Sequence, residues 1–237
     1  MVAASVLFGG IASMLLIGAA GQLLGVPVLL TLVIASALLL GLPIAAMIHL
    51  GLRGSALGLR RPSGVALIAG VLIGSTAWYL NVRLVMLLPF DEGSLHSFNH
   101  VVDQPPLIVA LLAIAVVPAI CEEVLFRGAV QRSLATKLFP VGAVLVTSLL
   151  FAGYHVSLIQ LVPTFTLAVM LGALAHRADS VVPGMVAHFL NNAMAILVAR
   201  RQPAALAGAL EAHPNLALVG CAIATLAGLT LIARGPA

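Results

Sequence analysis

Eight long apolar runs constrain this chain more than any other feature of its sequence, because short segments with Pro, Gly or charged residues separate them. A helix needs about 20 apolar residues to cross a bilayer, and Pro, Gly and charge commonly mark where such helices end. We therefore predict an all-α fold, a polytopic membrane helix bundle of about eight transmembrane helices. The runs fall at about 3–22, 27–51, 64–89, 106–135, 140–156, 158–176, 181–199 and 215–233.

The composition agrees with this class. Hydrophobic residues make up 62% of the chain and charged residues only 8%, with a mean hydropathy of +1.20, whereas a soluble domain carries about 25% charged residues. No segment resembles a separate soluble domain, so we predict a single integral-membrane domain over residues 1–237. The two cysteines, Cys121 and Cys221, each lie inside an apolar run, which argues against a disulfide framework.

The basic residues indicate an orientation in the membrane. Most of them lie at alternate ends of the apolar runs, the ends that the positive-inside rule assigns to the cytoplasm, so we expect both termini to be cytoplasmic. The residues that carry this expectation are Arg53, Arg60, Arg61, Arg132, Lys137, Arg177 and Arg234. Arg200 and Arg201 oppose it, whereas the loop with Asp91, Glu92 and Asp103 would lie outside.

The same charges exclude one class of partner. The formal net charge of +4 comes from short basic clusters between apolar runs rather than from a continuous basic surface, so we expect no nucleic acid. The chain is rich in alanine, and its basic residues are mostly arginine, which favours a bacterial protein of the inner (cytoplasmic) membrane. The expected partners are the lipid bilayer and a membrane-associated substrate.

Charged residues interrupt one apolar run at "CEEVLFRG", residues 121–128. Each charge near the middle of a spanning helix costs about 2.5–3.5 kcal/mol, so this cluster requires compensation or a function. Glu123 and Arg127 are four residues apart and can pair on one helical face. Glu122 is left without a local counter-charge and is a candidate general base or proton carrier. The structural alternative is an ion-pair cluster that packs helices together.

Two further motifs place polar residues on apolar helices. In "FAGYH", Phe151 and His155 lie one helical turn apart, and a single histidine there is more often a packing residue than a catalyst. In "HFLNN", His188 and Asn192 share one face at the i, i+4 spacing. The alternative for this pair is a hydrogen-bond clamp between helices, which is common in membrane bundles.

Together the three motifs supply the groups needed for amide hydrolysis. Glu122 can take a proton from water, and His155 can orient that water or share the proton. His188 and Asn192 can donate hydrogen bonds to an oxyanion. One difficulty is depth, because Glu122 and His155 lie far along helices that enter from opposite faces. Unequal helix lengths, tilt or a half-membrane helix after Pro140 would bring them level.

The order and spacing of these motifs resemble the CPBP family of intramembrane proteases, which includes type II CAAX prenyl proteases and bacteriocin-processing or immunity proteins. Its signature, E-E-x-x-x-R, F-x-x-x-H and H-x-x-x-N, is matched by "EEVLFR", "FAGYH" and "HFLNN". The resemblance covers residues 106–200 and implies a catalytic core there, within an eight-helix bundle. It implies catalysis by Glu122, His155, His188 and Asn192, with Glu123 and Arg127 as supports.

The family resemblance is compatible with two chemistries. As a metalloprotease, the chain would use Glu122, His155 and His188 as zinc ligands with a fourth position open for water. As a glutamate protease it would need no metal. We favour the metal-free reading with no cofactor, because Asn192 suits an oxyanion hole better than a zinc shell. No H-E-x-x-H zinc motif and no G-x-S-x-G serine motif occur in the sequence.

The sequence thus predicts an intramembrane endopeptidase that hydrolyses a peptide bond in a membrane-associated protein or peptide, with water activated by a glutamate. Two alternatives from other classes stay open. One is a catalytically silent membrane scaffold or bacteriocin-immunity protein, which an intact catalytic set disfavours. The other is a proton-coupled transporter with Glu122 as carrier, which the lack of detectable inverted repeats disfavours.

Overall fold

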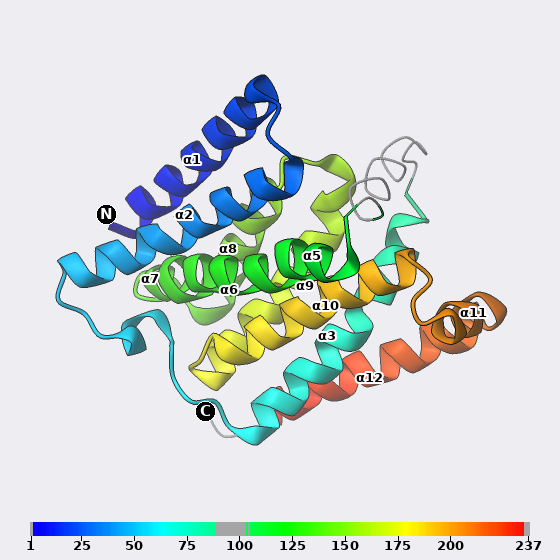
Figure 1. Cartoon of the computed structure of the whole chain (residues 1–237). Helices are drawn as coiled ribbons and strands as arrows, with labels where there is room; N and C mark the ends of the chain where they lie inside the picture. The colour runs from blue at the N-terminus through cyan, green and yellow to red at the C-terminus, as the bar shows by residue number, and fades with distance from the viewer. Residues whose placement is uncertain (1, 89–102, 104, 235–237) are drawn as a thin grey trace.

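The computed structural model describes residues 2–88, 103 and 105–234, and these residues form a bundle of helices without a strand (Figure 1). The elements are α1 (Val2–Leu24), α2 (Val28–His49), η1 (Gly54–Leu57), α3 (Gly64–Val85), α5 (Leu107–Ala110), η2 (Leu111–Val116), α6 (Val117–Glu123), η3 (Val124–Gln131), α7 (Arg132–Leu134), α8 (Pro140–Tyr154), α9 (Leu158–Ala178), α10 (Val182–Ala199), α11 (Ala204–Ala212) and α12 (Pro214–Arg234).

The eight apolar runs correspond to the long helices, so the predicted all-α membrane bundle is confirmed. Among the described residues, six helical segments are long and apolar enough to cross a membrane, and shorter apolar helices cover Phe8–Leu24 and Pro140–Tyr154. The sequence did not predict α11, a helix of nine residues between α10 and α12. The outward-facing acidic loop was predicted from Asp91, Glu92 and Asp103, but Asp91 and Glu92 lie outside the described residues.

The helix with the carboxylate pair lies at the centre of the bundle. Five consecutive elements from α5 to α7 form one continuous span, Leu107–Leu134, and two of these elements, η2 and η3, are π-helical. At about 1.5 Å per residue the span is about 40 Å long, more than the hydrocarbon core requires. It packs against α1, α2, α8, α9 and α10, which keeps its charged residues away from lipid.

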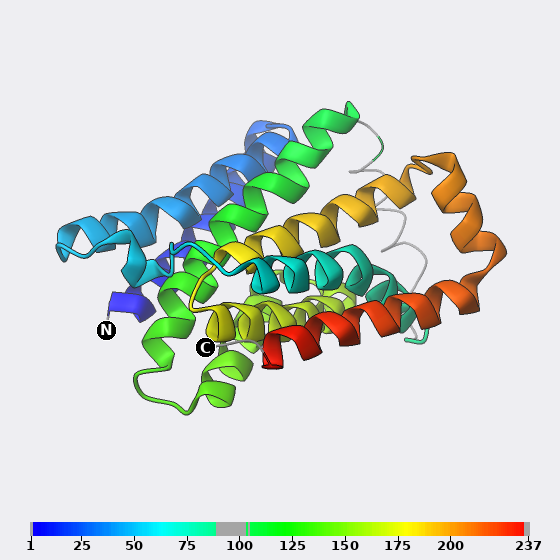
Figure 2. The same cartoon turned by 90° about the horizontal axis from the view of Figure 1, so that it is seen from below.

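Glycines bring α3 directly against α10. Gly70 and Gly74 lie one turn apart on α3, the small-xxx-small spacing that lets membrane helices approach closely. A Cβ at Gly70 would lie 2.6 Å from the carbonyl oxygen of Pro183, and one at Gly74 would lie 2.3 Å from that of Ala187. Figure 2 shows α10 and α12 on either side of α3, consistent with its extensive contacts to both. The backbone of α10 is therefore fixed beside His188.

Both ends of the described chain lie at one end of the bundle, together with η1, the α7–α8 turn and the α9–α10 turn (Figure 1). We call this the basic end. Its described residues include Arg53, Arg60, Arg61, Arg132, Lys137, Arg177 and Arg234 but one acidic residue, Asp179. Arg200 and Arg201 lie in the turn between α10 and α11, at the opposite end, where Arg201 pairs with Glu211.

Candidate active site

The carboxylates of the first motif end α6 and are buried in the middle of the bundle. Glu122 is 5% exposed and Glu123 is fully buried. Arg127 follows one turn later on the π-helical segment η3 and is also buried. α10 brings His188 to the same place from the other side, with 3% of its surface exposed. Two sequence-distant helices thus supply four ionisable side chains to one buried cluster.

Glu123 holds the cluster together. Its Oε1 accepts a hydrogen bond from Nη1 of Arg127 at 2.8 Å and another from Nδ1 of His188 at 3.0 Å. The ion pair expected from the i, i+4 spacing therefore forms. Arg127 also donates to the carbonyl of Ala168 at 3.1 Å, and its guanidinium lies 4.5 Å from the centre of the Phe151 ring. Glu123 thus couples the arginine to the histidine through one oxygen atom.

Glu122 faces the other nitrogen of the same imidazole. Its Oε2 lies 3.9 Å from Nε2 of His188, beyond hydrogen-bond distance, and this buried oxygen has no hydrogen-bond partner among the described residues. Because Nδ1 of His188 points at a carboxylate, which only accepts, Nδ1 carries a proton. In the neutral ring Nε2 is then an acceptor. Glu122 and His188 therefore place two acceptor atoms 3.9 Å apart.

His155 contacts the ring of Phe151, which also contacts His188, rather than either glutamate directly. It follows α8 as its C-terminal cap, is partly exposed, and donates from Nδ1 to the carbonyl of Phe151 at 2.9 Å. The Phe151 ring centre lies 4.9 Å from the His155 ring and 5.9 Å from the His188 ring. Within the described residues, His155 forms no ion pair with Glu122.

Asn192 lies one turn after His188 and contacts the helix with the carboxylates. Its Nδ2 donates to the carbonyl of Ile114 at 3.0 Å, and its Oδ1 accepts from Asn191 at 3.2 Å. A carboxamide nitrogen has two protons, so one N–H is left after the bond to Ile114. This second N–H is the group that can donate to a substrate oxygen.

Unequal helix lengths resolve the depth difficulty. Counted from the α7–α8 turn, Glu122 lies 12 residues before Leu134, whereas His155 lies 15 residues after Pro140. At about 1.5 Å per residue these separations correspond to about 18 and 22 Å. The two side chains therefore reach similar depths, because α8 has only 15 residues and ends at the site.

The alternative zinc set of Glu122, His155 and His188 does not assemble. A zinc site of this kind needs three side-chain ligands around one point. Glu122 and His188 approach each other, but the described part of the chain contains no group of three His, Cys, Asp or Glu side chains placed to hold a metal ion. We therefore derive no step through a metal.

Two site residues have roles that the sequence did not reveal. Phe151 contacts Arg127, His155 and His188 with its ring, although only its place in a motif pointed to it. Gly184, in the first turn of α10, lies against Glu123, because a Cβ there would be 2.9 Å from Oε2 of the carboxylate. The positive end of the α10 dipole favours a carboxylate at this position. The sequence "VPG" marked the helix start but not this contact.

Comparison with known families agrees with the three motifs. Residues 104–194 match the family model described as Rce1-like, type II CAAX prenyl endopeptidase Rce1-like. The matched segment spans all three motifs, from Glu122 to Asn192. No curated protein and no solved structure matched the chain. The resemblance inferred from the motifs is therefore confirmed over residues 104–194, where the chain matches an Rce1-like domain, consistent with the CPBP family.

Proposed function

We propose that this protein is an intramembrane endopeptidase that hydrolyses a peptide bond in a membrane-associated protein or peptide, using water activated by Glu122. One observation carries the proposal. Glu122 Oε2 is buried 3.9 Å from His188 Nε2 and has no hydrogen-bond partner in the part of the chain that the structure describes. A buried carboxylate oxygen that lacks a partner is costly, so its retention in the centre of a membrane bundle favours a chemical role over a structural one.

We place a single water molecule between these two atoms. Two acceptors 3.9 Å apart can each lie about 2.8 Å from one water oxygen, a normal hydrogen-bond distance. The water would donate one proton toward Glu122 and the other toward His188. Glu123 supports this arrangement, because its bond to Nδ1 of His188 at 3.0 Å keeps the lone pair on Nε2. The oxygen lone pairs of the water would then face the substrate carbonyl.

Hydrolysis then needs two proton transfers by one residue. As the water oxygen bonds to the carbonyl carbon, Glu122 takes a proton from the water, and a tetrahedral oxyanion forms. When the carbon–nitrogen bond breaks, Glu122 returns that proton to the leaving nitrogen. The products are a carboxylic acid and an amine, so atoms and charge balance. No cofactor is required, and general acid–base catalysis of this kind contributes about 100- to 10,000-fold.

We assign the oxyanion to Asn192 without His188, which was also expected there, because a neutral His188 that donates from Nδ1 to Glu123 accepts at Nε2 and has no proton for the oxyanion. The second N–H of Asn192 is the one not bonded to Ile114, and removal of such a donor typically costs about 100- to 1,000-fold in turnover. His155 has its Nδ1 proton bonded to the Phe151 carbonyl, so its Nε2 would accept a hydrogen bond from water or substrate. Glu123 and Arg127 act as supports. The metal-free mechanism is supported by the described residues, which include no group of three His, Cys, Asp or Glu side chains placed to hold a metal ion.

The proposed setting is a bacterial inner membrane with both termini in the cytoplasm. The basic end, which includes both ends of the described chain, carries seven basic residues and one acidic residue. Arg200 and Arg201 lie at the opposite end and count against this orientation, but the charge of Arg201 is offset by an ion pair with Glu211, with Nη2 to Oε2 at 3.1 Å. The positive-inside rule therefore favours the basic end as the cytoplasmic one.

The description of the matched family model names a CAAX prenyl endopeptidase, which supports a prenylated CAAX ending as the substrate to test first. The experiment reconstitutes the purified protein into liposomes and offers an internally quenched peptide with a prenylated CAAX ending, beside the same peptide without the prenyl group. Peptides that accumulate uncut in a deletion strain, identified by mass spectrometry, provide natural candidates. Cleavage of either set supports an endopeptidase, and a preference for the prenylated peptide supports the narrower class.

Complete lack of cleavage of both sets by folded protein would contradict the proposal. A partner that co-purifies under those conditions would then favour the scaffold function. Proton-coupled uptake into the same liposomes would instead favour the transporter.

A further inference from the structure

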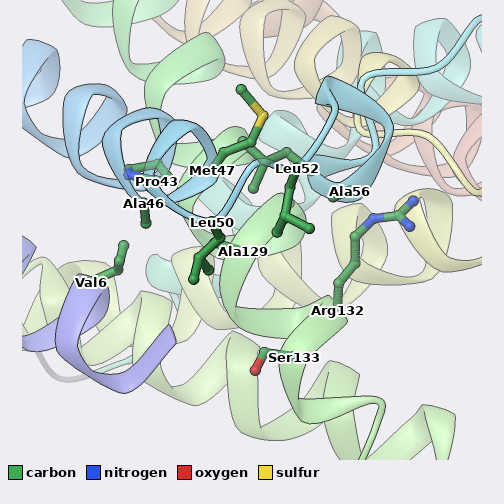
Figure 3. Close-up of a pocket in the computed structure, with 12 residues that line it drawn as sticks. Val6, Pro43, Ala46, Met47, Leu50, Leu52, Ala56, Ala129, Arg132 and Ser133 are labelled. Carbon is green, nitrogen blue, oxygen red and sulfur yellow. The ribbon is translucent and has the colours of Figure 1, made fainter. Parts of the chain in front are cut away.

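A cavity lies at the basic end, away from the carboxylate cluster. It has a volume of about 270 Å³ and lies between α1, α2, η1 and η3 (Figure 3). Its lining is apolar except at one rim, where Arg132 and Ser133 lie. Val6 and Arg132 mark opposite sides of it (Figure 3). Leu50 and Leu52 also line it and are about half exposed, so the cavity reaches the protein surface.

The charge at this rim is not balanced. Asp179 pairs with Arg132, with Nη2 to Oδ1 at 2.7 Å, and through its other oxygen with Arg60. One carboxylate thus pairs with two guanidinium groups, so the three side chains together carry a net charge of about +1. Each guanidinium has five N–H donors in a planar fork, more than Asp179 can accept. The remaining donors suit a phosphate oxygen, which arginine binds well.

The turn beside Arg132 is shaped to hold this side chain. Gly58 follows η1 with a φ of 69°, a conformation that favours glycine. A Cβ at Gly58 would lie 2.7 Å from Nε of Arg132, so any larger residue would displace the guanidinium. The neighbouring Val181 N–H donates to the Gly58 carbonyl at 3.0 Å, which ties this turn to the α9–α10 corner. The arginine is therefore held at the cavity rim.

We infer that this cavity binds an anionic phospholipid of the bilayer, with a segment of one acyl chain between α1, α2 and η3 and the phosphate at Arg132. The chain is an integral membrane protein, so phospholipid surrounds this end of the bundle. Basic pockets between membrane helices on the cytoplasmic side bind anionic lipid headgroups. The apolar lining suits an acyl chain, and the uncompensated arginine selects an anionic headgroup over a zwitterionic one.

The test measures binding rather than cleavage, so its outcome is independent of the proposed protease activity. Delipidated protein in detergent is titrated with phosphatidylglycerol, phosphatidylcholine or inorganic phosphate, and bound lipid is counted by native mass spectrometry. We expect phosphatidylglycerol to bind about tenfold more tightly than phosphatidylcholine, the scale of one hydrogen bond to a charged group. Inorganic phosphate alone should not raise the melting temperature, because it has no chain to fill the cavity.

Two variants and a matched control locate the site. Arg132→Gln should weaken phosphatidylglycerol binding about tenfold. Arg53→Gln removes the same charge from the same end but does not line the cavity, so it should weaken binding no more than about fivefold, the scale of a surface charge near anionic lipid. Ala46→Leu adds three carbons to the cavity wall and should displace part of the chain, with a loss of about tenfold for two methylenes.

Equal binding of the two phospholipids would overturn the inference. So would equal effects of Arg132→Gln and Arg53→Gln, or unchanged phosphatidylglycerol binding by Ala46→Leu. If inorganic phosphate raised the melting temperature as much as phosphatidylglycerol does, the proposed role of the acyl chain would be overturned. If Arg132→Gln does not fold, the inference is still tested by comparing the binding of phosphatidylglycerol and phosphatidylcholine to the wild-type protein and to Ala46→Leu.

Discussion

Replacement of Glu123 by glutamine tests whether this residue holds the buried cluster. The fully buried carboxylate accepts from Arg127 at 2.8 Å and from His188 at 3.0 Å. Without the charge on residue 123, Arg127 loses its ion pair but still donates to the carbonyl of Ala168 and contacts the Phe151 ring. Removal of one member of a buried ion pair costs about 3–5 kcal/mol. That is about a fifth or more of the stability of a typical domain.

The expected loss is large enough to measure with the protein's own fluorescence. Trp78 is the single tryptophan and is buried on α3, so unfolding in mixed micelles with increasing SDS can be followed directly. Glu123→Gln should lower the free energy of unfolding by about 3–5 kcal/mol. The matched control is Glu211→Gln, the same chemical change in an exposed pair with Arg201, which should cost no more than about 1 kcal/mol.

A double variant tests whether the loss of stability in Glu123→Gln comes from the unpaired charge of Arg127. Glu123→Gln combined with Arg127→Met removes both charges and should recover part of the lost stability, because no uncompensated cation is then left. If Glu123→Gln were as stable as Glu211→Gln, the reasoning about the buried pair would be refuted. A fully stable but inactive Glu123→Gln protein would indicate that the roles of the two carboxylates are reversed.

Three further predictions concern helix packing, the oxyanion and metal. Gly74→Ala places a Cβ 2.3 Å from the Ala187 carbonyl oxygen and must shift α10 beside His188, so turnover should fall about tenfold to 100-fold. The control is Gly41→Ala, whose Cβ meets no neighbour within 4 Å and which should keep wild-type turnover. Asn192→Ala should lower turnover about 100- to 1,000-fold with little change in substrate affinity, and a defect confined to affinity would assign it to substrate positioning. Activity should survive exhaustive chelation with no stoichiometric metal in elemental analysis, and loss of activity that zinc restores would reassign Glu122, His155 and His188 as ligands.

The helices could be predicted because a membrane imposes one dominant rule on the sequence. A spanning segment must be apolar and helical, so α2 (Val28–His49) and α10 (Val182–Ala199) lie within two residues of the apolar runs at 27–51 and 181–199. The short helix α11 and the π-helical segments η2 and η3 escaped prediction. Their ends depend on packing and hydrogen-bond register, which hydropathy does not encode.

The candidate site was predictable as a set of residues but not as a set of contacts. The i, i+4 rule anticipated the Glu123–Arg127 pair, because both residues lie on one helix. The contacts of His188 with both glutamates come from the packing of α10 against α6, which one-dimensional spacing does not contain. The Gly70-x-x-x-Gly74 spacing was the available signal for the close approach of α3 to α10.

The most direct test of the central claim is single-turnover cleavage by Glu122→Gln in liposomes, with a reporter peptide that the wild-type protein cuts. Glutamine keeps the shape of the side chain but cannot take a proton from water. We predict that the rate falls about 100- to 10,000-fold, that the variant stays folded and binds the peptide, and that Glu211→Gln cleaves at the wild-type rate. A folded Glu122→Gln protein that cleaves at the wild-type rate would contradict the assignment of Glu122 as the group that activates water.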